Sequence, residues 1–117
     1  FTSACPLFLE ILDKGTLNRA GAVSDESFNF KRLEREYGLI EAEVEGSKED
    51  SYEIKINSKK KILTHNCHDF MERRSTDKKF CKHLVKLFLL LKEENENFAL
   101  ELLNDIASSI NEWEFTH

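Results

Sequence analysis

Apolar residues near the start of the chain recur at the three- and four-residue spacing of an α-helix. This spacing predicts one helix over residues 6–13, a loop with at most a helical turn over 14–23, and a second helix over 24–37. Gly38 directly follows the second segment, in the position where a glycine commonly ends a helix. The first third of the chain is therefore predicted to consist of helices.

After residue 38 the pattern changes to an alternation of apolar and polar residues, which is the period of a β-strand with one buried face. This alternation predicts strands over residues 40–44, 52–56 and 60–67. Turn-forming residues fill the short gaps over 46–50 and 57–59. Because strands joined by short turns pair with their neighbours, the sequence predicts a three-stranded antiparallel β-meander.

Two segments near the end of the chain return to helical spacing, after a polar loop over residues 71–78. The first, 80–93, is apolar on nearly all sides, which is typical of a helix buried in a core. The second, 97–113, carries an apolar stripe that ends at Trp113. A short connection joins the two, so we expect them to pack as an antiparallel pair. The predicted fold class is α+β.

The length of 117 residues suits a single domain over residues 1–117, because two domains would each be too short to bury a sizeable core. Within it we expect N-terminal helices over 1–38, the sheet with the helix after it over 39–92, and a last helix over 93–117. An apolar fraction of 40% excludes a disordered tail. No apolar stretch approaches the roughly 20 residues that cross a bilayer, so we expect no membrane contact.

The chain has three cysteines, and this odd number does not make a disulfide framework. We expect thiols that stay reduced, free or on a metal, and hence an intracellular protein, cytoplasmic or, in a eukaryote, nuclear. The sequence begins at Phe1 with neither an initiator methionine nor a signal-peptide pattern. It is therefore expected to be a trimmed piece of a longer protein.

The net charge of −5 is unevenly distributed along the chain. Residues 48–86 hold eleven Lys and Arg against six Asp and Glu, a surplus of five positive charges, whereas the remainder holds six against sixteen. A local basic stretch matters more for phosphate contacts than the mean charge does. The alternative interpretation is an ordinary solvated loop, because runs of charge usually serve solubility.

Two pairs of metal-ligating residues stand out, His65 with Cys67 and Cys81 with His83. On a strand, residues i and i+2 share a face, so the first pair can present an imidazole and a thiolate side by side. The second pair begins the apolar helix, where both side chains can converge on one point. Four N and S ligands suit tetrahedral zinc. Any one of them alone would more simply be a buried cysteine or a hydrogen-bonded histidine, but two matched pairs favour a metal.

Neighbouring polar residues offer alternative roles. His68 would point to the opposite strand face, and Asp69 and Glu72 suit the loop rather than the metal. Catalytic zinc needs an open coordination position, whereas four protein ligands fill a tetrahedron, so we expect a structural ion and not an enzyme. A cysteine nucleophile would need an oxyanion-stabilising loop, and there is no glycine-rich phosphate loop for a small-molecule substrate.

The segments HNCHDF (65–70) and CKHLVKLFLLL (81–91) resemble the two halves of the SWIM zinc finger, C-x-C-x-D-F and C-K-H-x-x-A-x-x-L. Upstream, RLEREYGLIEAEVEGSKEDSYEIKI (32–56) is similar to the helix and two strands that precede them, with a V-x-G-S turn and a Y-x-V/I strand. The resemblance spans about 28–91. The sequence departs from the family at His65, which replaces the first cysteine. Imidazole is a good zinc ligand, so binding should survive with one less negative charge.

The resemblance implies the zinc ligands His65, Cys67, Cys81 and His83, and it implies a module that interacts with DNA and with proteins. Basic residues surround the expected zinc loop and are candidates for phosphate contacts. They are Lys59, Lys60, Lys61, Arg73, Arg74, Lys78, Lys79 and Lys82. No aromatic residue alternates with them along the sequence, which argues against stacking on single strands.

We therefore predict a zinc-stabilised nucleic-acid and protein interaction module, a DNA-associated adaptor in DNA repair, recombination or transcription with a protein partner. The alternative is a protein–protein assembly subunit that docks through its apolar helices, or through the acidic face over 41–45, without touching nucleic acid. Apolar stripes at this spacing also serve simply as core, in which case the helices cover each other and the sheet.

Overall fold

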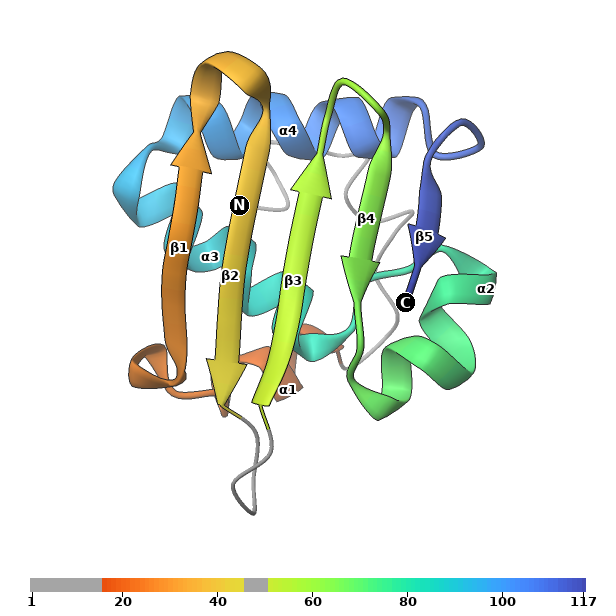
Figure 1. Cartoon of the computed structure of the whole chain (residues 1–117). Helices are drawn as coiled ribbons and strands as arrows, with labels where there is room; N and C mark the ends of the chain where they lie inside the picture. The colour runs from red at the N-terminus through yellow and green to blue at the C-terminus, as the bar shows by residue number, and fades with distance from the viewer. Residues whose placement is uncertain (1–15, 46–50) are drawn as a thin grey trace.

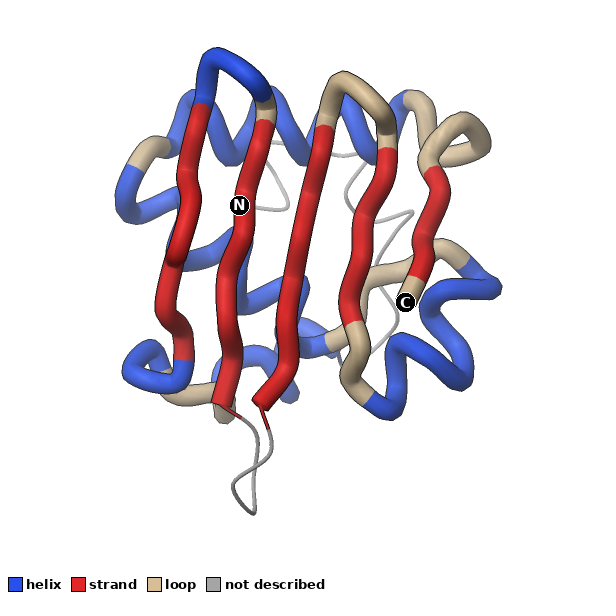
Figure 2. Tube along the Cα trace, viewed as in Figure 1, coloured by secondary structure: helices blue, strands red, loops and turns tan. Residues whose placement is uncertain are grey.

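The computed structural model describes residues 16–45 and 51–117, which form an α+β fold with helices packed against one face of a sheet (Figures 1 and 2). Within these residues the sheet has five strands in the order β1-β2-β3-β4-β5. They are β1 (Phe28–Glu34), β2 (Leu39–Glu45), β3 (Ser51–Asn57), β4 (Ile62–His65) and β5 (Glu114–Thr116). The first four pair antiparallel, and β5 lies parallel to β4.

The helical segments differ greatly in length. The long ones are α3 (Lys82–Glu94) and α4 (Glu96–Ser108), and the short ones are α1 (Thr16–Gly21), α2 (Ser75–Asp77), η2 (Asp25–Ser27), η3 (Arg35–Tyr37) and the π-helical η5 (Phe70–Arg74). Asn95 alone joins α3 to α4, and its side chain accepts a hydrogen bond from the Phe98 N–H at 3.1 Å. This single residue ends one helix and caps the next.

The core lies between the sheet and the helices. Alternate residues of β2, β3 and β4 are buried, which matches the predicted period of two. The same face includes Ile40, Ile56 and Leu63, each fully buried. From the other side α3 contributes Leu84 and Phe88, also fully buried. The predicted meander is therefore present, but as the centre of a larger sheet.

The predicted helix over 24–37 is wrong, because strand β1 occupies the middle half of that segment, between the short turns η2 and η3. Phe28 and Phe30 are partly buried and alternate with exposed polar neighbours, and they pair with Val44 and Ala42 of β2. The charged residues that follow are good helix formers, and tertiary pairing overrides that preference. Gly38 does end a helical turn, but the turn is η3.

The C-terminal part also departs from the prediction. The expected loop over 71–78 is helical, as η5 and α2, and the last helix ends at Ser108 rather than 113. The chain then turns, and β5 adds Phe115 beside Leu63 of β4. The predicted helix over 6–13 and turn over 46–50 lie outside the described residues.

Among the helices of residues 16–45 and 51–117, none combines the length and the apolar composition needed to cross a membrane.

Candidate metal centre

The four predicted ligands converge at the junction between the end of β4 and the start of α3. His65 is the last residue of β4, Cys67 follows two residues later, Cys81 is the N-cap of α3 and His83 lies in its first turn. Their ligand atoms all lie within 4.8 Å of one another, and all four residues are buried. Two pairs of residues that are separated by thirteen intervening positions, 68–80, thus form one compact cluster.

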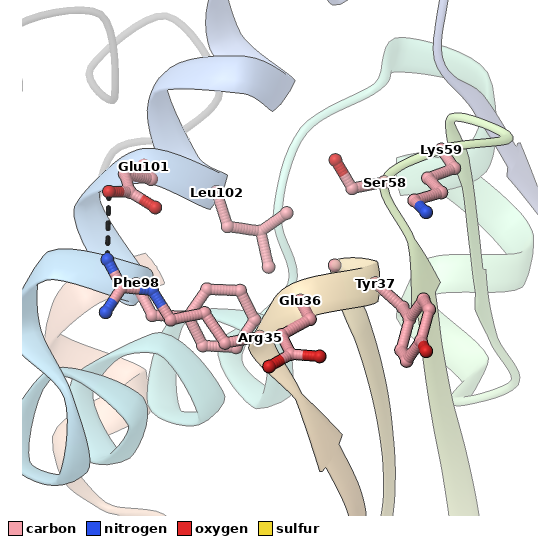
Figure 3. Close-up of a pocket in the computed structure, with 9 residues that line it drawn as sticks. Arg35, Glu36, Tyr37, Ser58, Lys59, Phe98, Glu101 and Leu102 are labelled. Atoms are coloured by element: carbon pink, nitrogen blue, oxygen red, sulfur yellow. Dashed lines mark hydrogen bonds and ion pairs between the residues drawn. The ribbon is translucent and has the colours of Figure 1, made fainter.

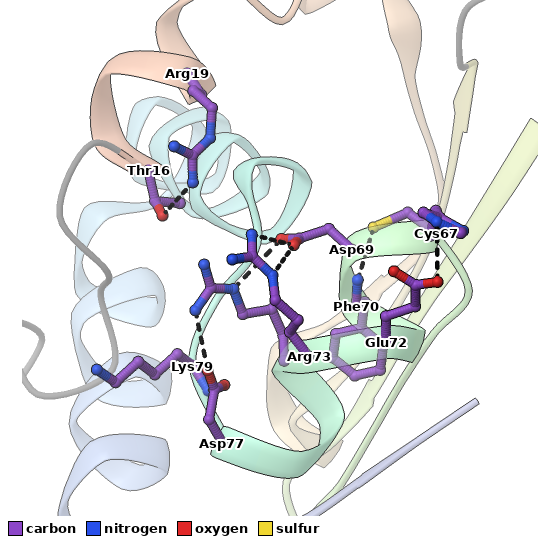
Figure 4. A network of polar contacts seen from close by, with 11 residues as sticks. Thr16, Arg19, Cys67, Asp69, Phe70, Glu72, Arg73, Asp77 and Lys79 are labelled. Atoms are coloured by element: carbon purple, nitrogen blue, oxygen red, sulfur yellow. Dashed lines mark hydrogen bonds and ion pairs between the residues drawn. The ribbon is translucent and has the colours of Figure 1, made fainter.

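Strand register places the first pair. His65 pairs with Ile54 of β3 and is fully buried, as is Leu63 two residues earlier, so the imidazole points toward the helices. Beyond it the chain leaves the sheet and turns into η5. The Phe70 N–H donates to the Cys67 Sγ at 3.4 Å in this turn (Figure 4). Such a bond favours the thiolate form of a metal-ligating cysteine.

One ring nitrogen each of His65 and His83 is buried and has no hydrogen-bond partner among the described residues. His65 Nδ1 lies 2.7 Å from the Glu53 carbonyl oxygen, and because a carbonyl can only accept, Nδ1 carries the proton. His65 Nε2 and His83 Nδ1 are both buried without a hydrogen-bond partner. Buried polar atoms are nearly always satisfied. A metal ion between them would satisfy both nitrogens at once.

The thiols of Cys67 and Cys81 shift each other's pKa in opposite directions. A hydrogen bond from Cys81 lowers the pKa of the Cys67 thiol far below its usual range, and the two nearby histidines lower it further. Burial, together with the Cys67 thiolate, raises the pKa of Cys81. A bound metal would hold both sulfurs as thiolates.

The cluster fits a tetrahedral ion. Ligands at about 2.0–2.3 Å from a central zinc would lie roughly 3.3–3.8 Å apart, so a slight contraction of the present spacing suffices. His68 is excluded from the cluster, because its side chain is 80% exposed and its Nε2 lies 3.1 Å from the Glu72 Oε1. The residues His65, Cys67, Cys81 and His83 could therefore hold a metal ion.

A surface hollow of about 350 Å³ opens beside the cluster. Cys67, Cys81 and His83 line it together with Tyr52, whereas His65 lies behind them. Three cationic side chains, Arg19, Arg73 and Lys82, and one carboxylate, Asp69, also border it. The hollow is thus positively charged on balance, and α1 contributes to it through Arg19, which no motif in the sequence indicated.

Two of the predicted phosphate contacts, Arg74 and Lys61, instead have partners within the protein. Arg74 is buried and donates to Asp69 at 3.3 Å and to Asp77 at 3.0 Å. Lys61 bonds Asp105 at 3.1 Å and lies over the Trp113 ring. The Arg74 guanidinium and the Lys61 ammonium therefore donate to groups of the protein itself, whereas the sequence suggested that both face solvent.

The remaining basic residues divide between two ends of the molecule. Lys78 donates to the Ile110 carbonyl at 3.2 Å, while Arg73 pairs with Asp69 at 2.6 Å (Figure 4). Lys79 and Lys82 lie in the segment leading into α3 and at its start. Residues 59–61 lie at the turn between β3 and β4, at the opposite end of β4 from His65 (Figure 1). The predicted basic residues therefore do not form one surface.

Replacing Arg74 should destabilise the fold, unlike replacing its neighbour. We expect Arg74→Met to lower the free energy of unfolding by about 2–3 kcal/mol, because it leaves two partly hydrated carboxylates without their buried partner. Arg73→Ala removes an exposed ion pair and should cost less than about 1 kcal/mol. Urea unfolding of both variants measures the difference, and equal costs would contradict this assignment.

Comparisons with protein-family models, with curated proteins and with solved structures found no match for this chain.

Proposed function

We propose that His65, Cys67, Cys81 and His83 hold a structural zinc ion, and that the chain is a SWIM-type module. Two thiolates and two imidazoles are a typical zinc ligand set, and four protein ligands complete a tetrahedron. The observation that carries the proposal is the presence of two buried, unpartnered imidazole nitrogens in a cluster whose four ligand atoms, two of them cysteine sulfurs, lie within 4.8 Å of one another. In such a site zinc supplies folding energy and not chemistry.

The ion would join two layers of the fold. Its ligands come from the end of β4 and from the start of α3, so coordination would fix the sheet against the buried helix. It would also hold the intervening segment, with η5 and α2, at both ends. That segment and the start of α3 carry Arg73, Lys79 and Lys82 beside the cationic hollow.

We further propose that the surface around this hollow, with Arg19, Arg73 and Lys82, contacts nucleic-acid phosphates. This metal-side surface would serve a DNA-associated adaptor in repair, recombination or transcription. The surplus of positive charge around the hollow supports the proposal, in a chain whose net charge is −5. Asp69, the one carboxylate there, already accepts hydrogen bonds from Arg73 and Arg74. A protein partner of the adaptor remains part of the proposal.

Salt-dependent binding tests this contact. We expect a labelled DNA duplex to bind the zinc-loaded chain, and Lys82→Glu to weaken binding and reduce the slope of log affinity against log salt by about one. Lys31→Glu is the matched control, because Lys31 is exposed on β1 and pairs with Glu43 of β2, away from the metal cluster. Fluorescence anisotropy between low and moderate salt measures both. Equal effects of the two variants would overturn a metal-side contact.

The alternative of docking through the apolar helices gains no support. Only Leu33, Tyr37 and Met71 are exposed large hydrophobic side chains in the described part of the chain, and none lies on α3 or α4. The acidic strand face is also largely neutralised. Glu43 pairs with Lys31 at 2.7 Å, and Glu41 lies 3.7–3.9 Å from Arg32 and Lys55.

A further inference from the structure

The fold brings an exposed aromatic ring to the basic turn at the far end of the sheet. Tyr37, in η3, is 54% exposed, and the Lys59 Nζ lies 5.0 Å from its ring centroid. The Ser58 N–H donates to the Gly38 carbonyl at 2.9 Å and holds the two turns together. Gly38 has a φ of +59°, and a Cβ there would lie 2.5 Å from the Ser58 Cβ. Glycine thus permits the close approach of these turns.

Tyr37 and Lys59 border two adjoining hollows. One lies toward α4 and is lined by Phe98 and Leu102 (Figure 3). The other, of about 500 Å³, lies toward the face of the sheet opposite the helices, and Arg32, Leu39 and Lys60 line it. A third hollow continues from there along the same face past Lys55 and Ile62. An extended groove therefore runs over the sheet with an aromatic ring at one end.

The groove is positively charged on its sheet side. The two hollows there have four cationic side chains, Arg32, Lys55, Lys59 and Lys60, against the carboxylates Glu34 and Glu41. Both carboxylates lie close to Arg32. Lys59 and Lys60 form no ion pair with any carboxylate of the described residues and are exposed. Within the described part of the chain, neither ammonium group is neutralised by a carboxylate, and that of Lys59 lies over the Tyr37 ring.

We propose that the surface formed by Arg32, Tyr37, Lys59 and Lys60, the Tyr37 surface, binds single-stranded nucleic acid. A base stacks on Tyr37 while Lys59 and Lys60 contact the flanking phosphates. An exposed aromatic ring beside a cationic groove can bind both the base and the phosphate of an unpaired nucleotide. An acidic peptide would contact only the lysine and arginine side chains. A duplex hides its base faces and cannot stack on the ring. The proposal rests on the proposed function in one respect only, that the partner is a nucleic acid.

The test uses fluorescence anisotropy with the zinc-loaded full chain and two probes, a labelled oligothymidylate of about 12 nucleotides and a duplex of equal length. We expect Tyr37→Ala to weaken single-strand binding about tenfold, the effect of losing one base–aromatic stack. Tyr37→Phe, which keeps the ring, should bind within about twofold of the unmodified chain. Lys59→Glu with Lys60→Glu should abolish binding and its salt dependence. Circular dichroism and zinc content confirm that each variant is folded.

Several results would overturn the proposal. Binding unchanged by Tyr37→Ala, or a duplex bound more tightly than the single strand through Lys59 and Lys60, removes the stacking contact. Displacement of the single strand by oligoglutamate at equal charge concentration assigns the surface to acidic peptides. If Lys82→Glu weakens binding and Tyr37→Ala does not, the metal-side contact survives alone, and the converse leaves the Tyr37 surface alone. If neither probe binds, both proposals fail.

Discussion

Replacing Cys81 with serine should abolish stoichiometric zinc binding and lower the free energy of unfolding by about 4 kcal/mol, the contribution of a ligand at a thousand times its dissociation constant. Cys81 is fully enclosed at the start of α3, and its sulfur lies within 4.8 Å of the three other ligand atoms. The loss removes one ligand and leaves the remaining donors buried without a partner. Elemental analysis of zinc per chain and urea unfolding, with and without a chelator, measure both effects.

His68→Ala is the matched control for this experiment. His68 directly follows Cys67, and its imidazole could bind a metal as those of His65 and His83 could. Its side chain, however, is exposed and lies beside Glu72. We expect this variant to retain one zinc per chain and to unfold at nearly the same urea concentration as the unmodified chain. If chelation leaves the stability of the unmodified chain unaltered, the ion is not structural. If His68→Ala loses the metal, the ligand set is different.

We expect Trp113→Ala to lower the free energy of unfolding by about 3–5 kcal/mol, a loss similar to that of Cys81→Ser. Trp113 is 1% exposed and lies between α4 and β5, with the Lys61 Nζ 5.8 Å from its ring centroid. The next residue, Glu114, donates its backbone N–H to the Lys61 carbonyl at 2.8 Å, where β5 begins to pair. Removing the indole leaves a cavity at the point where the chain rejoins the sheet.

Urea midpoints and thermal unfolding measure this cost. Glu112→Ala is the control, because Glu112 is exposed in the same turn and its removal should change the free energy of unfolding by less than about 0.5 kcal/mol. Trp113→Phe keeps most of the buried volume, so its free energy of unfolding should lie between those of Trp113→Ala and Glu112→Ala. A decrease in the free energy of unfolding of less than about 1 kcal/mol for Trp113→Ala would mean that the pairing of β5 with β4 does not depend on the indole.

Local periodicity was sufficient to predict the centre of the sheet. β2 and β3 alternate over seven residues each, and both were predicted to within one or two residues. The convergence of His65, Cys67, Cys81 and His83 could also be predicted, because each pair is separated by one residue. The expected strand over 60–67 is too long, however, since β4 ends at His65 and Cys67 lies beyond it. The α+β class follows from these elements together.

The other strands and the surface could not be predicted in this way. β1 carries residues such as Lys31 and Glu34 that suit a helix equally well, and β5 has only three residues, so both depend on a neighbouring strand. The burial of Arg74 depends on carboxylates brought to it by η5 and α2. Tyr37 and Lys59 meet only because two turns, 22 residues apart, lie at the same end of the sheet.

The parallel pairing of β5 with β4 sets an order for assembly. Leu63 and Phe115 are partners across 52 positions, whereas the pairings among β1, β2 and β3 close over short connections. Closing a long loop costs more chain entropy and slows the step that depends on it. The hairpins therefore gain their contacts early, and the strand that ends at His65 acquires its second neighbour only after the helical hairpin has docked and returned the chain to the sheet.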